Sequence, residues 1–196
     1  MADTLTRRSP LQGWESRFAD MPESARIVEV PFVAMVDLWL DPTGPGAVEA
    51  ADVLGVTSLP TTPCTTIDGQ DATVIWLGPQ EWLVTSNSRG GEDLETRLRD
   101  RLTEHGGAAV DVSAQRTTVR LRGAHARDVL AKGCSLDLHP AEFGRGAAAQ
   151  TMLGLAAVVL LPLSDDGTDY RILVRSSFAG YLAEWLLDAA EEFGVD

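Results

Sequence analysis

The sequence predicts an α+β protein made of duplicated β-α-β units, with antiparallel sheets and helices packed on them. Strand-like segments occur as hairpins separated by short amphipathic helices, which favours antiparallel over parallel sheets. The hairpin WLGPQEWLVTS and the helix after it are matched by LLPLSDDGTDYRILVRS and a second helix, roughly 90 residues later. We therefore expect an N-terminal arm at residues 1–24, a first α+β repeat at 25–106 and a second at 107–196.

Composition indicates a globular protein that is associated with neither a membrane nor nucleic acid. The 196 residues are 44% hydrophobic and 23% charged, with a formal net charge of −13. The longest apolar run, residues 153–163, falls short of the roughly 20 residues that span a bilayer, and no signal peptide is recognisable. We therefore expect a cytoplasmic protein. An acidic chain without a basic stripe interleaved with aromatic residues is also a poor match for nucleic acid.

The N-terminal arm is polar but carries an apolar edge. Leu11, Trp14 and Phe18 recur at helical spacing between Pro10 and Pro22, which predicts a short helix or an extended arm. Two interpretations stay open, since this edge either docks on the protein's own core or requires a partner to cover it.

Alternating patterns bounded by turn residues predict the strands. They lie at residues 26–30, 32–40, 64–67, 72–77 and 81–86 of the first repeat, and at 110–113, 117–122, 147–152, 156–161 and 170–174 of the second. In the segment TTVRLRG, Val119 and Leu121 are expected to face the core. Thr118, Arg120 and Arg122 then face solvent.

Apolar stripes at helical spacing predict helices at residues 47–54, 92–105 and 124–132, and a last one after Ser177. Gly55 ends the first of these helices. Gly133 is expected to end the third because glycine accepts the left-handed conformation. Ser177 is a predicted N-cap for the last helix. Its apolar stripe comprises Phe178, Tyr181, Leu182, Trp185, Leu186 and Ala189.

Basic residues are concentrated in one stretch. Between residues 116 and 132, a single acid, Asp128, accompanies five cations, which are Arg116, Arg120, Arg122, Arg127 and Lys132. On an acidic chain, this basic island either docks an anionic ligand or an acidic partner surface, or forms a solvated strand face and helix face.

Residue types used in catalysis occur without the spacing that catalysis needs. Cys64 and Cys134 lie far apart, which suggests neither a disulfide framework nor a zinc site. His105, His125 and His139 have no companions at metal-ligand spacing, and the sequence contains no nucleophile-elbow, Rossmann or P-loop motif. We expect no catalytic, cofactor-binding or metal-binding residue in this chain.

Two further features have alternative interpretations. Cys134 is either a small residue holding a turn or a thiol whose pKa the neighbouring Lys132 lowers. Trp76 and Trp82 meet across a predicted hairpin, either as core residues or as a stacking platform for a flat heterocycle. The candidate interface or ligand residues are therefore Arg116, Arg120, Arg122, Lys132, Cys134, His139 and Trp82.

Five segments carry a family resemblance, namely WLGPQEWLV, VDVSAQRTTVRLRG, ARDVLAKGCSLDLHP, AAAQTMLG and YRILVRSSFAGYLAEWLLDAA. In order and spacing they resemble the gamma subunit of heterotetrameric sarcosine oxidase over roughly residues 8–192. The most specific parts are the turn GP before EWL, and KGCSLDLHP at residues 132–140. More distantly, the second half resembles the folate-binding repeat of glycine-cleavage aminomethyltransferases, in agreement with the duplicated α+β architecture.

The resemblance implies a non-catalytic subunit that supports assembly of a flavoenzyme. Such a complex oxidatively demethylates sarcosine to glycine, with hydrogen peroxide and either formaldehyde or 5,10-methylenetetrahydrofolate as products. It implies alpha, beta and delta subunits as partners. It also implies FAD, FMN, NAD, tetrahydrofolate and zinc in those other subunits, and no cofactor bound by this chain.

Two alternatives come from other classes. One is a stand-alone folate-binding one-carbon transferase, or a folate-dependent iron-sulfur maturation protein. The maturation proteins share Lys132-Gly133-Cys134, but they continue with an aromatic residue and a Gly-Gln pair where this chain has Ser135-Leu136-Asp137. The other is a purely structural protein unrelated to amine oxidation, which the specific turn motif disfavours.

Overall fold

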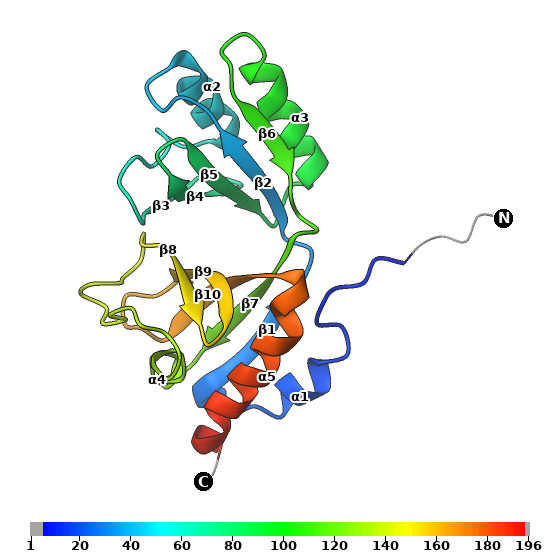
Figure 1. Cartoon of the computed structure of the whole chain (residues 1–196), viewed down its shortest axis with the longest axis vertical. Coiled ribbons are helices and arrows are strands. Elements are labelled where there is room, and N and C mark those ends of the chain that lie inside the picture. Colours follow the sequence, from blue (N-terminus) through cyan, green and yellow to red (C-terminus); the bar gives the residue numbers. More distant parts are fainter. Residues whose placement is uncertain (1–5, 195–196) are drawn as a thin grey trace, which may run out of the picture.

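Two five-stranded antiparallel sheets make up the computed structural model, which describes residues 6–194 (Figure 1). The upper sheet of Figure 1 consists, in order, of β3 (Thr66–Asp68), β4 (Thr73–Gly78), β5 (Glu81–Ser86), β2 (Ala34–Trp39) and β6 (Ala108–Asp111). The lower sheet consists, in order, of β1 (Arg26–Val30), β7 (Arg116–Arg122), β10 (Asp169–Arg175), β9 (Ala156–Pro162) and β8 (Ala149–Leu153). The predicted α+β class with antiparallel sheets is confirmed.

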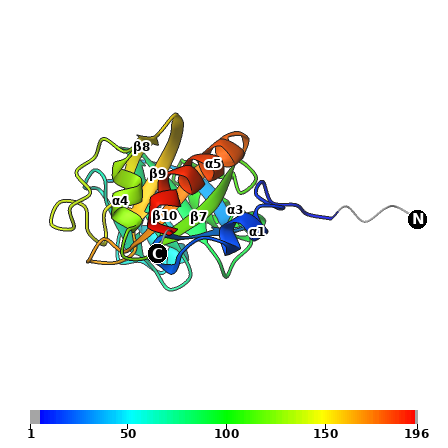
Figure 2. The ribbon, with the colours of Figure 1, turned by 90° about the horizontal axis from the view of Figure 1, so that it is seen from below.

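Helices cover the outer face of each sheet. They are α1 (Glu15–Ala19), α2 (Pro45–Leu54), α3 (Gly91–Leu102), α4 (Ala126–Ala131) and α5 (Ala179–Ala190), with single 3₁₀ turns at Glu23–Ala25, Ser176–Phe178 and Glu191–Gly194. Helices α2 and α3 pack on the upper sheet. Helices α4 and α5 contact each other and share the lower sheet's core with α1 (Figure 2).

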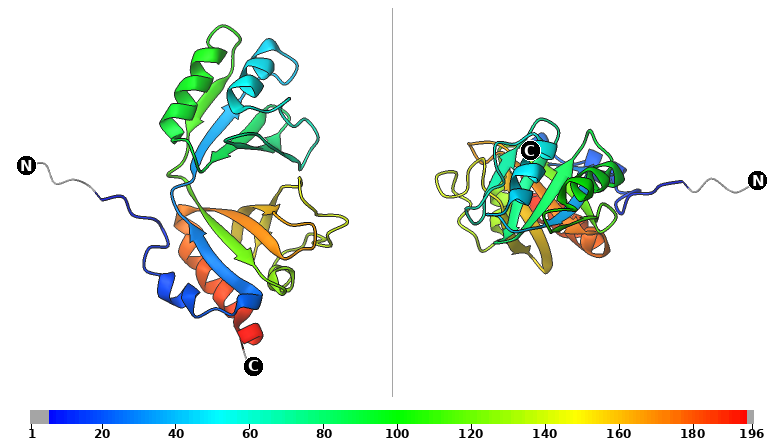
Figure 3. Two further views of the ribbon diagram at one scale, coloured as in Figure 1. Left: turned by 180° about the vertical axis from the view of Figure 1, so that it is seen from behind. Right: turned by 90° about the horizontal axis from the view of Figure 1, so that it is seen from above.

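The chain crosses between the two sheets twice. After β1 it leaves the lower sheet for β2 of the upper one, and after β6 it returns to the lower sheet as β7 (Figure 3). As a result β1 pairs with β7, with Arg26 opposite Arg122, and β6 pairs with β2, with Asp111 opposite Val36. The repeats predicted at residues 25–106 and 107–196 stay a prediction. The upper sheet includes β6, which comes from residues 107–196, and the lower sheet includes β1, which comes from residues 25–106.

Three apolar cores hold these layers together. One lies between the lower sheet and its helices, and another between the upper sheet and α2 and α3. The third joins the inner faces of the two sheets and contains Val33, Met35, Ile75, Leu83, Ala148, Val159, Leu161 and Leu173. Because this third core draws on both sheets, the two layers form one folded body.

The inner core also corrects one burial prediction. Thr118 was expected to face solvent with Arg120 and Arg122, yet only 1% of its surface is exposed. Thr118 lies on the predicted face of β7, but the upper sheet covers the middle of that face. Arg120 is half-buried, and Arg122, at the strand end, is exposed as predicted.

Helix ends follow the predictions in one case and differ in two. Gly55 ends α2 in the left-handed conformation, with φ 66°. Helix α4 ends next to Gly133 as predicted, but Gly133 lies outside the left-handed region. The predicted reason for this helix end, a left-handed glycine, is therefore wrong. A Cβ at Gly133 would instead overlap the Trp185 ring, so glycine is needed for close packing of α4 on α5. Ser177 is not a cap either, because it lies inside a 3₁₀ turn and α5 starts after Phe178 without a side-chain cap.

The arm docks on its own chain. Leu11 and Phe18 are 1% and 5% exposed and belong to the lower sheet's core. Arg17 donates two hydrogen bonds to Glu184 of α5, at 2.6 and 2.7 Å. Of the two interpretations of the apolar edge, intramolecular docking is confirmed for these residues.

Between residues 6 and 194, none of the helices has the length and apolar character needed to cross a lipid bilayer.

Candidate functional site

Charged side chains from both sheets meet at one side of the inner core. We call this region the inter-sheet crevice and define it by Arg116 and Arg175 of the lower sheet and Asp37 and Glu81 of the upper sheet. Arg116 begins β7 on the same face as Thr118, which looks toward the upper sheet. Arg175 ends β10 directly opposite Arg116, so the two arginines lie side by side on neighbouring strands.

The crevice contains a hollow of about 330 Å³ on the lower-sheet side. Arg116 and Arg175 line it together with Gln150 and Met152 of β8. The Gln150 side-chain amide donates to the Leu77 carbonyl at 2.9 Å, which connects the edge strand β8 to the β4–β5 hairpin. The residues that line the hollow all belong to the lower sheet, and the Gln150 hydrogen bond links its edge to the upper sheet.

The two arginines have no acidic partner at ion-pair distance. Within residues 6–194, no carboxylate oxygen lies within 4.0 Å of a guanidinium nitrogen of either one. The Arg116 guanidinium donates a hydrogen bond to the neighbouring Gln115 side chain, at 2.6 Å. Burial, and next the charge of Arg175, lower the pKa of Arg116 from its usual range. Two like charges at directly opposite positions of antiparallel strands repel each other.

The acids across the crevice are also incompletely satisfied. Burial, and next the Asp37 carboxylate, raise the pKa of Glu81 above its ordinary value. One Asp37 oxygen, Oδ1, is buried without a hydrogen-bond partner, and the other accepts a hydrogen bond from Trp39 Nε1 at 3.3 Å. A buried polar atom without a partner costs free energy, so Asp37 Oδ1 is available to accept a hydrogen bond that residues 6–194 do not supply.

Exposed apolar side chains surround these charges. Trp39 and Val110 are 48% and 51% exposed and lie opposite Glu81 and Asp37 on neighbouring strands. Met152, on the lower-sheet side, is 47% exposed. Aromatic, methionine and arginine side chains are the types enriched in protein–protein interfaces. The arrangement can bind a carboxylate through its guanidinium groups and an apolar segment along its rim.

The predicted basic island is not a single surface. Arg120 pairs with Asp169 through two side-chain contacts, one of them Nε to Oδ1 at 2.8 Å. These hydrogen bonds raise the pKa of Arg120. Lys132 lies on the opposite side of the lower sheet, where it donates to the Ala189 carbonyl and pairs with Glu192. Arg122 is exposed at the end of β7. Only Arg116 of the island faces the inter-sheet crevice.

The other candidate residues have structural environments. Trp82 is fully buried and donates from Nε1 to the Pro60 carbonyl at 2.8 Å, so it cannot serve as a stacking platform. Cys134 is a free, half-buried thiol 4.0 Å from Thr151 Oγ1. His139 accepts a hydrogen bond at Nδ1 from the Ala141 N–H at 3.2 Å and is exposed.

Sequence reasoning missed three of the four residues that define the crevice. Asp37 had a usable signal, because it is the single charge within the apolar segment FVAMVDLWL. Arg175 and Glu81 stand at strand ends, where charges are common, and only the strand register places them beside Arg116 and Asp37.

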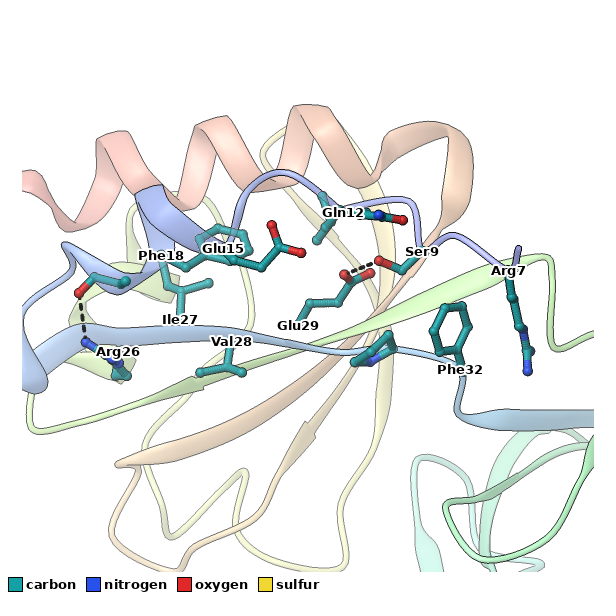
Figure 4. A pocket seen from close by; sticks show the side chains of 13 residues that line it. Arg7, Ser9, Gln12, Glu15, Phe18, Arg26, Ile27, Val28, Glu29 and Phe32 are labelled. Carbon is teal, nitrogen blue, oxygen red and sulfur yellow. Dashed lines mark hydrogen bonds between the residues drawn. The ribbon is translucent and has the colours of Figure 1, made fainter. Parts of the chain in front are cut away.

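A second hollow, of about 510 Å³, lies between the arm and β1 (Figure 4). Glu29 closes one part of it by accepting hydrogen bonds at 2.6 Å from the hydroxyls of Ser9 and Thr117. Arg7 lies over the ring of Phe32, 4.4 Å from its centre, at the other end. Apolar floor residues such as Leu11 and Phe18 are those that dock the arm, so this hollow accompanies the packing of the arm on β1.

Metal-ligand geometry is not found in the described part of the chain. Between residues 6 and 194, no group of three or more His, Cys, Asp or Glu side chains is placed to hold a metal ion.

Comparison with known proteins gives a consistent family. The sarcosine oxidase gamma subunit family (SoxG) matches residues 40–192. A sarcosine oxidase subunit gamma from Corynebacterium sp. strain U-96 is 33% identical over 202 aligned residues, which cover 98% of this chain and 94% of that protein.

Solved structures agree with the sequence comparison. A chain of the heterotetrameric sarcosine oxidase from Corynebacterium sp. U-96, in complex with pyrrole 2-carboxylate, has a TM-score of 0.87 and 33% identity, with 97% of each chain covered. The glycine cleavage system aminomethyltransferase T from Bartonella henselae has a TM-score of 0.57 at 16% identity and covers 88% of this chain and 48% of its own, which shows a shared fold. The chain belongs to the sarcosine oxidase gamma subunit family.

Proposed function

We propose that this chain is the non-catalytic gamma subunit of a cytoplasmic heterotetrameric sarcosine oxidase, with alpha, beta and delta subunits as its partners. The observation that carries the proposal is the match along the whole chain, at a TM-score of 0.87, to a chain of a heterotetrameric sarcosine oxidase. The complex would oxidatively demethylate sarcosine to glycine, with hydrogen peroxide and formaldehyde or 5,10-methylenetetrahydrofolate as products.

The cofactors FAD, FMN, NAD, tetrahydrofolate and zinc are proposed to lie in the partner subunits. This proposal is supported by how the reactive side chains of this chain are engaged. His125 is paired with Asp128 at 2.9 Å, and Lys132 is held by the end of α5 and the turn after it. Among residues 6–194, neither side chain hydrogen-bonds to a serine or cysteine nucleophile in the way that covalent catalysis requires. The role of the chain is then to complete and stabilise the assembly.

The proposal is tested by removing the chain from its native host. Deletion is expected to abolish sarcosine-dependent formation of hydrogen peroxide, and expression of the intact chain is expected to restore it. The stand-alone folate-binding transferase or maturation protein makes the opposite prediction. In that case the purified chain binds tetrahydrofolate by itself with about micromolar affinity or better, and sarcosine oxidation survives the deletion.

A further inference from the structure

We infer that Arg116 and Arg175 together bind a carboxylate side chain on a partner subunit, so that the inter-sheet crevice is the docking surface for an acidic segment with apolar neighbours. The inference rests on the proposed subunit function and names the chemistry of one contact.

The first argument is the register of the two arginines. They stand directly opposite each other on β7 and β10, where side chains of neighbouring antiparallel strands begin about 5 Å apart. Both line the same hollow of about 330 Å³. A carboxylate placed between two guanidinium groups accepts charge-assisted hydrogen bonds from both and cancels their repulsion.

The second argument is a comparison with Arg120, which lies between them and the far end of β7. Arg120 has its own acid, Asp169, on the same neighbouring strand that carries Arg175. The positive charge of Arg120 is therefore paired within the chain. Between residues 6 and 194, no carboxylate oxygen lies within 4.0 Å of the Arg116 or Arg175 guanidinium. The Asp37 and Glu81 carboxylates attract Arg116 from beyond ion-pair distance, which leaves the two guanidinium groups free to accept a carboxylate at hydrogen-bond distance.

The third argument concerns the surroundings of the pair. A small free anion needs only the charges, whereas exposed Met152 and Trp39 at the same crevice favour an occupant with an apolar surface as well. Asp37 and Glu81 on the opposite wall repel a second carboxylate, which restricts how an acidic segment can lie. A protein segment with one acid and apolar neighbours satisfies all three features.

The test compares tagged full-length chains captured from the native host, with the amount of co-eluting oxidase subunits measured at increasing salt. Arg116→Met combined with Arg175→Met removes both charges and keeps long side chains. Arg122→Met is the matched control, because Arg122 lies on the same face of β7 but away from the crevice. The double variant is expected to bind its partners about tenfold more weakly or worse, while the control binds like wild type.

Thermal unfolding of the isolated chains separates docking from folding. Removing two repelling cations is expected to leave Tm unchanged or raise it, so that partner binding falls while stability does not. The inference is overturned if the double variant retains its partners, or if Arg122→Met weakens capture equally. It is also overturned if inorganic phosphate raises the Tm of wild type but not of the double variant while capture is unaffected, since the pair then binds a small anion. If wild type itself captures no oxidase subunits, the proposed function fails instead.

Discussion

Gly133 is a residue at which close packing leaves no room for a larger side chain. A Cβ there would overlap the Trp185 ring and come within 3.0 Å of the Gly154 nitrogen. We expect Gly133→Ala to lower the free energy of unfolding by about 1–3 kcal/mol through overpacking. Gly180→Ala is the control, and we expect it to raise the free energy of unfolding. Its Cβ would meet only Trp14, at 4.0 Å, and alanine stabilises a helix by up to about 1 kcal/mol. Urea denaturation of both variants checks the pair, and equal effects would contradict the packing assignment.

Glu81 provides a prediction of pH dependence. Its pKa is raised by burial and by Asp37, so the folded state holds the proton more tightly than the unfolded chain does. At pH values above the folded-state pKa, Glu81 is ionised and destabilises the fold. This penalty vanishes as the pH falls below the ordinary pKa of a glutamate, about 4.3. Glu81→Gln is expected to raise Tm slightly at pH 7, because solvent screens this partly exposed group, and to change nothing near pH 3.

The pH test needs a carboxylate without such surroundings as its reference. Glu142 is exposed and has no ion pair within the described residues, so Glu142→Gln should leave Tm unchanged at both pH values. A loss of stability in Glu81→Gln at pH 7, or a gain that persists at acid pH, would show that ionised Glu81 does not destabilise the fold.

Residue roles were predictable where they depend on local spacing, and unpredictable where they depend on strand register. Gly55 was assigned correctly because a helix end is a local feature. Arg116 was grouped with Lys132 because they are close in sequence, but the chain between them passes from one side of the lower sheet to the other. Its actual neighbour, Arg175, comes from a strand more than fifty residues later.

At the level of elements, the docking of the arm is driven by apolar burial. Leu11 is almost fully buried, so Leu11→Ala is expected to cost about 2–4 kcal/mol of unfolding free energy. The exposed Arg17–Glu184 pair should matter far less, because solvent screens it. Arg17→Met is therefore the control, and chemical denaturation ranks the two. If Leu11→Ala leaves the isolated chain unaffected and weakens only partner capture, the arm belongs to an interface.

Strand and helix positions after the arm were largely predictable, since every one was expected within about three residues of its observed ends. Pairing partners were not predictable in the same way. Nothing in the local pattern of β1 indicates that it joins β7 instead of the adjacent β2, because alternation fixes which face is buried and not which strand lies alongside.

At the scale of the whole molecule, the inner core makes the two sheets one cooperative unit. Ile75 is fully buried on the upper sheet and faces the lower one. We expect Ile75→Ala to lower stability by about 2–4 kcal/mol and to do so equally for β5 and β10, as read by hydrogen exchange of peptides from each sheet. Val48→Ala, at an exposed position of α2, should change neither. Protection that persists in β10 after β5 has opened would show two independent units.

The central claim is that this chain works as part of an oxidase assembly, and one measurement addresses it directly. The tagged chain is purified from its native host under mild conditions, and the co-eluting chains are identified by mass together with a visible absorbance spectrum. We predict recovery of three further subunits with flavin absorbance. A colourless chain eluting alone, and binding tetrahydrofolate without partners, would contradict the account.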